Sequence, residues 1–122
     1  MHPRIEPLGK VHDRQSFRSG AAEIDDWFRH RAGQDARRNV ARVFVAVDPD
    51  EQRNVRGFYS LGAYTIAIDE LPNEAARKLP RYDAIPAALI GRLARNEQLA
   101  GQGMGALLLA DALCRILTAA ET

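Results

Sequence analysis

Three glycines alternate in the stretch AGQGMG at residues 100–105, directly before the apolar run ALLLADALCRIL. Because glycine has no Cβ atom, it lets backbone N–H groups approach a ligand closely. The first turn of a helix adds unpaired N–H groups and a partial positive charge. Together these features can bind phosphate groups without a lysine. The stretch is therefore a candidate phosphate-binding turn, although a tight turn between a strand and a helix would use the same glycines.

Two well-known nucleotide-binding motifs do not match this turn. A P-loop requires G-x-x-x-x-G-K-[ST], and no such pair of lysine and hydroxyl residue follows here. A dinucleotide fingerprint requires G-x-G-x-x-G in an early βαβ unit, whereas G-x-G-x-G stands late in this chain. The glycine pattern alone is therefore a weak signal.

Other reactive residue types show no pattern that indicates a site. The three histidines are scattered without the spacing of metal ligands, so we expect no metal site. Ser60 lacks a histidine and a carboxylate at a suggestive spacing, which disfavours a hydrolase triad. The single cysteine, Cys114, excludes an internal disulfide and suits a reducing cytoplasm.

Arginine is the other residue type that suggests a ligand. Arg37, Arg38 and Arg42 lie close together in the sequence, and Arg92 stands in the strand-like segment LIGRLARN. Clustered arginines are typical of proteins that bind the phosphates of a nucleic acid. A solvated helix face would carry the same residues, and a net charge of +1 disfavours a strong overall attraction to nucleic acid. Both interpretations remain open at this point.

Hydrophobic periodicity predicts the elements that must position these residues. Strands are expected near residues 5–8, 43–47, 55–68 and 89–96, with the second and third paired antiparallel. Helices are expected near residues 19–32 and 104–120, a short helix or turn at 34–42, and an irregular connection at 69–88. This order predicts one α/β or α+β domain over residues 1–122, with a mixed sheet flanked by helices. No apolar segment resembles a signal peptide or a membrane span, so we expect a cytoplasmic protein without membrane contact.

The flanks of the glycine turn carry a family resemblance. The segment RLARNEQLAGQGMGALLLADAL resembles the central motif of the GNAT acetyltransferases, R/Q-x-x-G-x-G/A between the fourth strand and the next helix. Five segments in order resemble the GNAT toxins of bacterial toxin–antitoxin pairs, and together they cover nearly the whole chain: FRSGAAEIDDWFRHRA, RVFVAV, GFYSLGAYTI, LPRYDAIPAALIGRLA and GQGMGALLLADAL.

The resemblance implies a fold, an activity and partners. The fold would be acyl-CoA N-acyltransferase-like. The activity would be the transfer of acetyl from acetyl-CoA to the amino group of aminoacyl-tRNA, which blocks translation. The partners would be an antitoxin of the ribbon-helix-helix type and a second copy of the chain. Acetylation of a protein or a small-molecule amine is a weaker alternative, because the arginines favour RNA.

The resemblance also assigns roles to residues of this chain. The fourth-strand backbone would bind pantetheine, and the turn amides would bind the pyrophosphate. Arg92 would lie near the acceptor site, and the other three arginines would contact tRNA. The implied cofactor residues are Leu93, Ala94, Arg95, Ala100, Gly101, Gln102, Gly103, Met104 and Gly105. The implied substrate residues are Arg37, Arg38, Arg42 and Arg92.

The chain departs from the family pattern in two places. Ala100 stands where the family has arginine or glutamine, so we expect weaker phosphate binding there. The sequence ends with the glycine-turn helix, whereas the family continues with a strand, a helix and a hairpin. The family's general-acid tyrosine would lie beyond Thr122, so we do not assign that role to Tyr59, Tyr64 or Tyr82.

We therefore expect a domain without its C-terminal third, whether as a fragment, a frameshifted remnant or a protein completed by a partner. The strand near residues 89–94 would then be an open edge that invites pairing. The alternative function is a catalytically inactive module that binds an antitoxin or a complementing chain.

Overall fold

The computed structural model describes residues 3–67 and 84–120. Its elements, in chain order, are β1 (Arg4–Pro7), α1 (Ala22–His30), α2 (Ala32–Arg37), β2 (Arg42–Asp48), β3 (Glu51–Ala67), β4 (Ala84–Arg95), the short 3-10 helix η2 (Glu97–Leu99) and α4 (Met104–Ala120). The helix expected after the glycine turn therefore has the bounds that its sequence predicted.

The strands form a single four-stranded sheet in the order β1-β2-β3-β4. Every pair of named strands is antiparallel, so the described sheet differs from the mixed sheet that the sequence predicted. The reason is the connections between strands. The segment that contains α1 and α2 brings the chain back to the C-terminal end of β1, where Pro7 pairs with Phe44 of β2. A turn of two residues then joins β2 to β3. The edges of the described sheet are β1 and β4.

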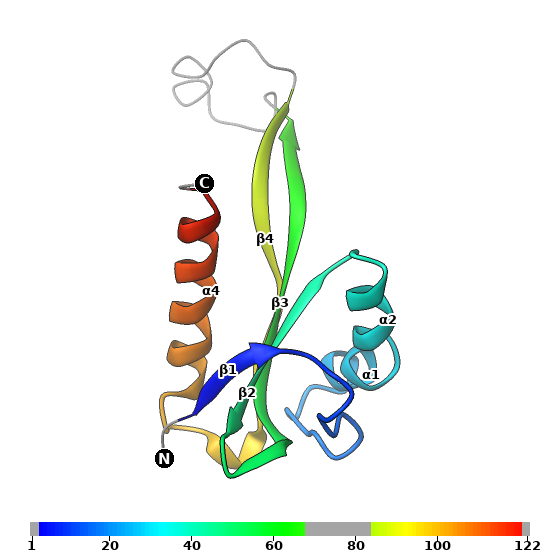
Figure 1. The fold of residues 1–122 in the computed structure, drawn as a ribbon, viewed down its shortest axis with the longest axis vertical. Coiled ribbons are helices and arrows are strands. Elements are labelled where there is room, and N and C mark those ends of the chain that lie inside the picture. The colour runs from blue at the N-terminus through cyan, green and yellow to red at the C-terminus, as the bar shows by residue number, and fades with distance from the viewer. Residues whose placement is uncertain (1–2, 68–83, 121–122) are drawn as a thin grey trace.

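The fourth strand begins earlier than predicted. β4 starts at Ala84, so residues 84–88 belong to a strand and not to the expected irregular connection. Pro86 pairs with Thr65 there, and a proline is tolerated because β4 is an edge strand of the described sheet. The long β3–β4 ribbon extends beyond the helices (Figure 1). The remainder of the expected connection, residues 69–83, lies outside the described residues.

The core has two layers, one on each face of the sheet. Alternate residues of β2 point to opposite faces, so Val45 packs with α1 and α2 while Phe44 packs with α4. On the first face, the Phe28 and Phe58 rings stack with centroids 4.1 Å apart. Figure 1 shows α4 along one side of the sheet and the α1–α2 pair on the other. Trp27 and Phe28 are the buried apolar residues of α1 in this layer.

Only one face of α4 is covered in the described structure. Leu108 and Ala112 are fully buried against the sheet. Leu109, Leu113 and Leu117 remain 44%, 47% and 63% exposed. The sheet therefore covers only the side of α4 that faces it. Among the described residues, no helix has both the length and the apolar character needed to cross a bilayer.

Candidate cofactor cleft

The glycine turn has the geometry that its sequence suggests. Gly101 and Gly103 have φ angles of +78° and +80°, a left-handed backbone that side chains disfavour. A Cβ atom built on Gly101, Gly103 or Gly105 would meet no heavy atom within 4 Å. Glycine is therefore required at 101 and 103 by backbone conformation, and the space in front of the turn is open.

The backbone amides at the start of α4 are free to bind a ligand. Gln102 N–H donates to the Leu99 carbonyl at 3.3 Å, and Leu107 N–H donates to the Gly103 carbonyl at 3.0 Å. Within residues 3–67 and 84–120, no hydrogen bond engages the amides of residues 103–106. These donors lie at the positive end of a 17-residue helix. The turn can therefore accept an anion without first breaking a contact.

A cleft of about 310 Å³ lies beside the turn. The end of β4 forms one wall of the cleft, and Gly105 lines the cleft at the start of α4. The segment that leads into α1, together with α1 itself, forms the opposite wall. The structure thus brings together the predicted strand residues and the helix start, which are Leu93, Ala94, Arg95 and Gly105. The sequence did not predict the opposite wall, which consists of Ser19, Ala21 and Ile24.

The other turn residues lie away from this cleft. Gln102, Gly103 and Met104 line a second hollow, of about 150 Å³, together with Leu99. Ala100 is exposed and has an extended backbone, with φ −58° and ψ 137°. The glycine turn therefore separates two hollows, and only its helix end faces the cleft beside β4.

A bulge in β4 lies directly before the strand residues of the cleft. Ser60 pairs with Arg92 and Leu61 pairs with Ile90, so Gly91 has no partner on β3. Ser60 Oγ accepts the Arg92 N–H at 3.0 Å, and a Cβ on Gly91 would lie 3.0 Å from that oxygen. The β2–β3 register also shifts, beside Gly57, whereas the β3–β4 shift falls opposite Gly91.

Asp25 orders the far wall of the cleft. Its side chain is buried, and its Oδ1 accepts hydrogen bonds from Ser19 N–H at 3.0 Å and from Ser19 Oγ at 2.7 Å. Glu97 N–H donates to the Arg18 carbonyl at 2.9 Å, which ties the end of β4 to the same segment. Asp25 therefore fixes Ser19 in the wall of the cleft. No spacing in the sequence indicates this contact between residues 18 and 97.

Tyr59 is engaged away from the cleft. Its hydroxyl donates to Asp111 Oδ2 at 2.5 Å, and Arg115 Nε donates to the same oxygen at 2.8 Å. Burial, followed by the neighbouring carboxylate, raises the pKa of Tyr59 well above its ordinary value. A phenol held in this way is a poor proton donor for catalysis, which agrees with leaving Tyr59 without that role. The Tyr64 side chain and Tyr82 lie outside what the structure describes.

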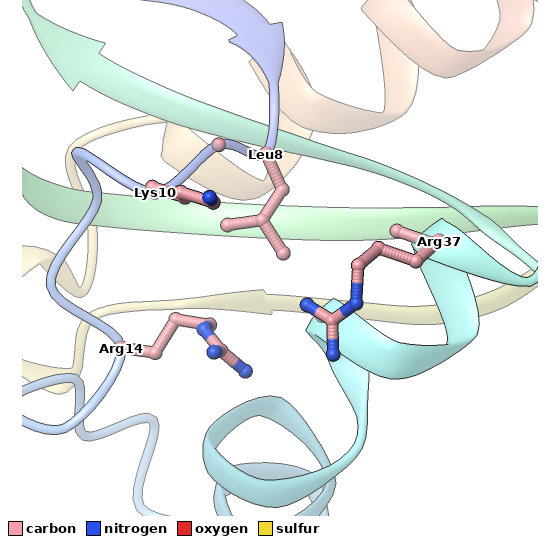
Figure 2. Close-up of a pocket in the computed structure, with 7 residues that line it drawn as sticks. Leu8, Lys10, Arg14 and Arg37 are labelled. Atoms are coloured by element: carbon pink, nitrogen blue, oxygen red, sulfur yellow. The ribbon is translucent and has the colours of Figure 1, made fainter.

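The structure separates the predicted arginine set. The Arg92 guanidinium lies 4.3 Å from the centre of the Trp27 ring, and Arg42 lies 5.1 Å from that of Phe44. Arg38 is exposed at the end of α2. Arg37 lines a different pocket, together with two basic residues that the sequence did not single out (Figure 2). The described residues contain no group of three or more His, Cys, Asp or Glu side chains that could hold a metal ion.

No protein-family model matches the chain, but two curated relatives align with nearly all of it. The chain is 35% identical over 118 residues to "Probable toxin TacT" of Sinorhizobium fredii, covering 96% of this chain and 65% of the relative. It is 34% identical over 115 residues to a "tRNA-acetylating toxin" of Mycobacterium tuberculosis, covering 94% of this chain and 66% of the relative. The chain thus spans about two thirds of the length of these relatives.

Solved structures share the fold, which confirms the fold class expected from the sequence. AtaT complexed with acetyl-methionyl-tRNAfMet matches with a TM-score of 0.88 and 27% identity, over 99% of this chain and 72% of AtaT. AtaTR bound with AcCoA matches with a TM-score of 0.82 and 28% identity, over 96% of this chain and 69% of the solved chain. An AtaT mutant bound to the C-terminus of the antitoxin AtaR matches with a TM-score of 0.79 and 26% identity, over 98% of this chain and 69% of the solved chain.

Proposed function

We propose that this chain, a relative of the GNAT-type toxins of toxin–antitoxin systems, acts in acetyl-CoA-dependent acetylation of the amino group of aminoacyl-tRNA. The proposal that the chain binds acetyl-CoA rests on one observation. An open glycine turn presents unengaged amides at the positive end of α4, next to an edge strand and a cleft. The relatives named as tRNA-acetylating, and the neighbour complexed with an acetylated aminoacyl-tRNA, support the substrate half.

We propose a role in binding acetyl-CoA for the turn and for the cleft beside it. The amides at residues 103–106, which have no hydrogen-bond partner among the described residues, would bind the diphosphate, and the backbone of residues 93–95 would bond the pantetheine amides along the open edge of β4. Bound acetyl-CoA supplies an acetyl group activated as a thioester. Because the strand and the turn would hold this donor in one orientation, the chain contributes mainly by positioning it for the amine. A β4 amide that points at the thioester oxygen would polarise the carbonyl as the amine attacks.

Cofactor binding is tested by isothermal titration calorimetry with acetyl-CoA and by thermal unfolding with the same ligand. We expect saturable heat and an increase in Tm, because a ligand that binds only the folded state stabilises it. No heat and no change in Tm at millimolar acetyl-CoA would contradict the proposal.

The substrate is tested separately, with charged tRNA and acetyl-CoA labelled in the acetyl group. We expect label in the aminoacyl group, and none in uncharged tRNA or in a lysine-rich protein. Arg92 is the side chain we propose as the nearest contact to the tRNA acceptor end, because its guanidinium is held on the Trp27 ring. Arg38 and Arg42 are proposed to contact tRNA phosphates, and Arg37 is treated separately below. Labelling of the protein in place of tRNA would favour the weaker alternative of a protein amine.

A second candidate function is partner binding without catalysis, and the exposed leucines of α4 favour it. An uncovered apolar helix face of this kind marks an interaction surface. The partners we propose are an antitoxin of the ribbon-helix-helix type, a complementing chain, or a second copy of this chain. The structural neighbour that is bound to the C-terminus of AtaR supports the antitoxin as a partner.

Acetylation of charged tRNA by this chain alone would exclude a catalytically inactive module. We propose a cytoplasmic location, because aminoacyl-tRNA, the proposed substrate, is present there.

A further inference from the structure

A basic pocket of about 290 Å³ lies on the face of the sheet that carries α1 and α2. Three segments form it: the chain just after β1, the loop at Arg14, and α2. β1 and β4 are opposite edges of the described sheet, so the pocket lies three strands away from the β4 wall of the cofactor cleft. The two sites share no lining residue.

Three cations line this pocket, and no acidic residue lines it. Figure 2 shows the Arg14 and Arg37 side chains extending into the same space, with Leu8 pointing into it from the chain after β1. Lys10 is the third cation. In the part of the chain that the structure describes, none of the three forms an ion pair. Asp13, directly before Arg14, accepts a hydrogen bond from Ser16 Oγ at 2.7 Å, and Asp35, two residues before Arg37, accepts one from Trp27 Nε1 at 3.0 Å.

Arg14 is held in place before any ligand binds. Its Nη1 donates to the carbonyls of Phe28 and Arg29, each at 3.2 Å. A Cβ atom on Gly33 would lie 3.1 Å from Arg14 Nη2, so the glycine lets the guanidinium lie close against α2. The donors on Nη2 and Nε have no partner among the described residues. A fixed guanidinium with free donors loses little side-chain entropy when it binds an anion.

The loop that carries Lys10 is also fixed. His12 is buried, and its Nδ1 accepts the Gly9 N–H at 2.9 Å. That bond leaves the proton on Nε2, which lies 2.7 Å from Glu6 Oε2 and donates to it. Asp13 N–H donates to the Arg53 carbonyl at 2.8 Å, which attaches the loop to the neighbouring strand. Two of the three cations therefore come from an ordered segment.

We propose that this pocket binds a phosphate group. Three cations from three segments match the several oxygens of a phosphate better than the two oxygens of a carboxylate. Leu8 and Ala36 add apolar wall, which strengthens the electrostatic attraction by limiting water. The phosphate belongs either to the backbone of an RNA or to a free phosphate ion. The inference stands apart from acetyl transfer, because no residue of the pocket lines the cofactor cleft.

The test compares Arg37→Gln and Lys10→Gln with the matched control Arg31→Gln. All three side chains are exposed, and among the described residues none of them makes a side-chain hydrogen bond or ion pair that its substitution would break. Arg31 and Arg37 stand at opposite ends of α2, and Arg31 does not line the pocket, so the control removes the same charge from the same helix. NMR titration follows the binding of inorganic phosphate and of a short RNA that carries no amino acid. Circular dichroism checks that each variant is folded.

We expect phosphate to shift the amide signals of Gly9, Lys10 and Gly33. We also expect Arg37→Gln and Lys10→Gln each to weaken phosphate binding by about tenfold, while Arg31→Gln changes it by less than about twofold. If RNA binding weakens in parallel, the ligand is a backbone phosphate. If RNA binding is unchanged, the ligand is a free phosphate.

Three results would overturn the inference. The first is an absence of pocket shifts at about 50 mM phosphate. The second is an equal loss of binding in Arg31→Gln, because that would indicate diffuse attraction to a basic surface. The third is tighter binding of a hexaglutamate peptide than of either phosphate or RNA, because the site would then recognise an acidic protein segment.

Discussion

At the scale of single residues, Gly103 links backbone conformation to ligand binding. Its φ of +80° turns the chain into α4, and the next amides point into open space. A β-branched side chain at such an angle costs on the order of 1–3 kcal/mol. The turn would relieve this strain by rotating the amides away from their present positions.

The substitution Gly103→Val should therefore weaken acetyl-CoA binding by about tenfold or more. Calorimetry measures the affinity, and circular dichroism shows whether the helix content is retained. Gln102→Ala is the matched control, because it changes an exposed residue of the same turn without a positive φ. Equal affinities of wild type and Gly103→Val would refute the role given to the turn.

Asp111 is a second residue whose contacts predict a measurable effect, here on the free energy of unfolding. It accepts hydrogen bonds from Tyr59 and Arg115, and the Arg115 guanidinium also lies 4.1 Å from the centre of the Phe44 ring. Asp111→Ala leaves both donors without this acceptor. We expect the free energy of unfolding to fall by about 1–3 kcal/mol in urea denaturation. Thr118→Ala, on the same stripe of α4, should change it far less, and a similar loss in both variants would contradict the argument.

Tyr59 also predicts how stability changes in alkali. Burial, and then Asp111, raise the pKa of Tyr59 in the folded state above its unfolded value of about 10. Below that pH the folded and unfolded chains bind the same number of protons at this group. As the pH rises through about 10, the unfolded state loses the proton first, so stability falls. Tyr59→Phe should show a smaller decrease in Tm between about pH 9 and 11 than wild type. An identical decrease would show that other groups control alkaline unfolding.

At the scale of elements, the bulge in β4 controls where the strand edge lies. Ser60 Oγ occupies the position that a side chain at residue 91 would need, and it accepts the Arg92 N–H. The cleft residues follow immediately after this irregular point. The bulge therefore sets the direction in which the backbone of residues 93–95 enters the cleft.

Ser60→Ala should speed hydrogen exchange at the Arg92 amide by about fivefold to tenfold, because a hydrogen bond is worth about 1 kcal/mol. Exchange at amides of β2, which lies within the sheet, is the internal control and should not change. NMR measures both in one sample. Unchanged exchange at Arg92 would mean that the serine does not hold the bulge.

At the scale of the whole molecule, the described fold leaves an apolar helix face and a strand edge without cover. Leu113 and Leu117 lie on this face, and β4 ends the described sheet. Exposed apolar faces and open edges both favour association with another chain. We expect self-association that increases with concentration in sedimentation velocity.

The double substitution Leu113→Glu and Leu117→Glu should remove this association, because it places two charges on the contact face. Gln98→Glu is the control, since it adds a charge at an exposed position on the 3-10 helix before the turn. A monomer at all concentrations in wild type would show that this face needs no second copy.

The sequence by itself determined the elements whose signals are local. The bounds of α4, the glycine turn before it and the strand β2 could all be predicted, because helical periodicity, glycine and β-branched residues act within a few positions. The residues of β4 and of the helix start that line the cleft were also named from the sequence, through the resemblance of one continuous segment. Residue types at fixed spacing along one segment are visible in a sequence.

Only the tertiary structure decided which distant residues share a site. It placed Ser19 opposite Arg95 in one cleft, and Arg37 beside Lys10 and Arg14 in another pocket. It also separated Arg37 from Arg42, although the two lie close together in the sequence. The physical reason is that such contacts depend on how the two faces of the sheet are covered, and this packing minimises exposed apolar area over the whole chain. No short stretch of sequence contains that information.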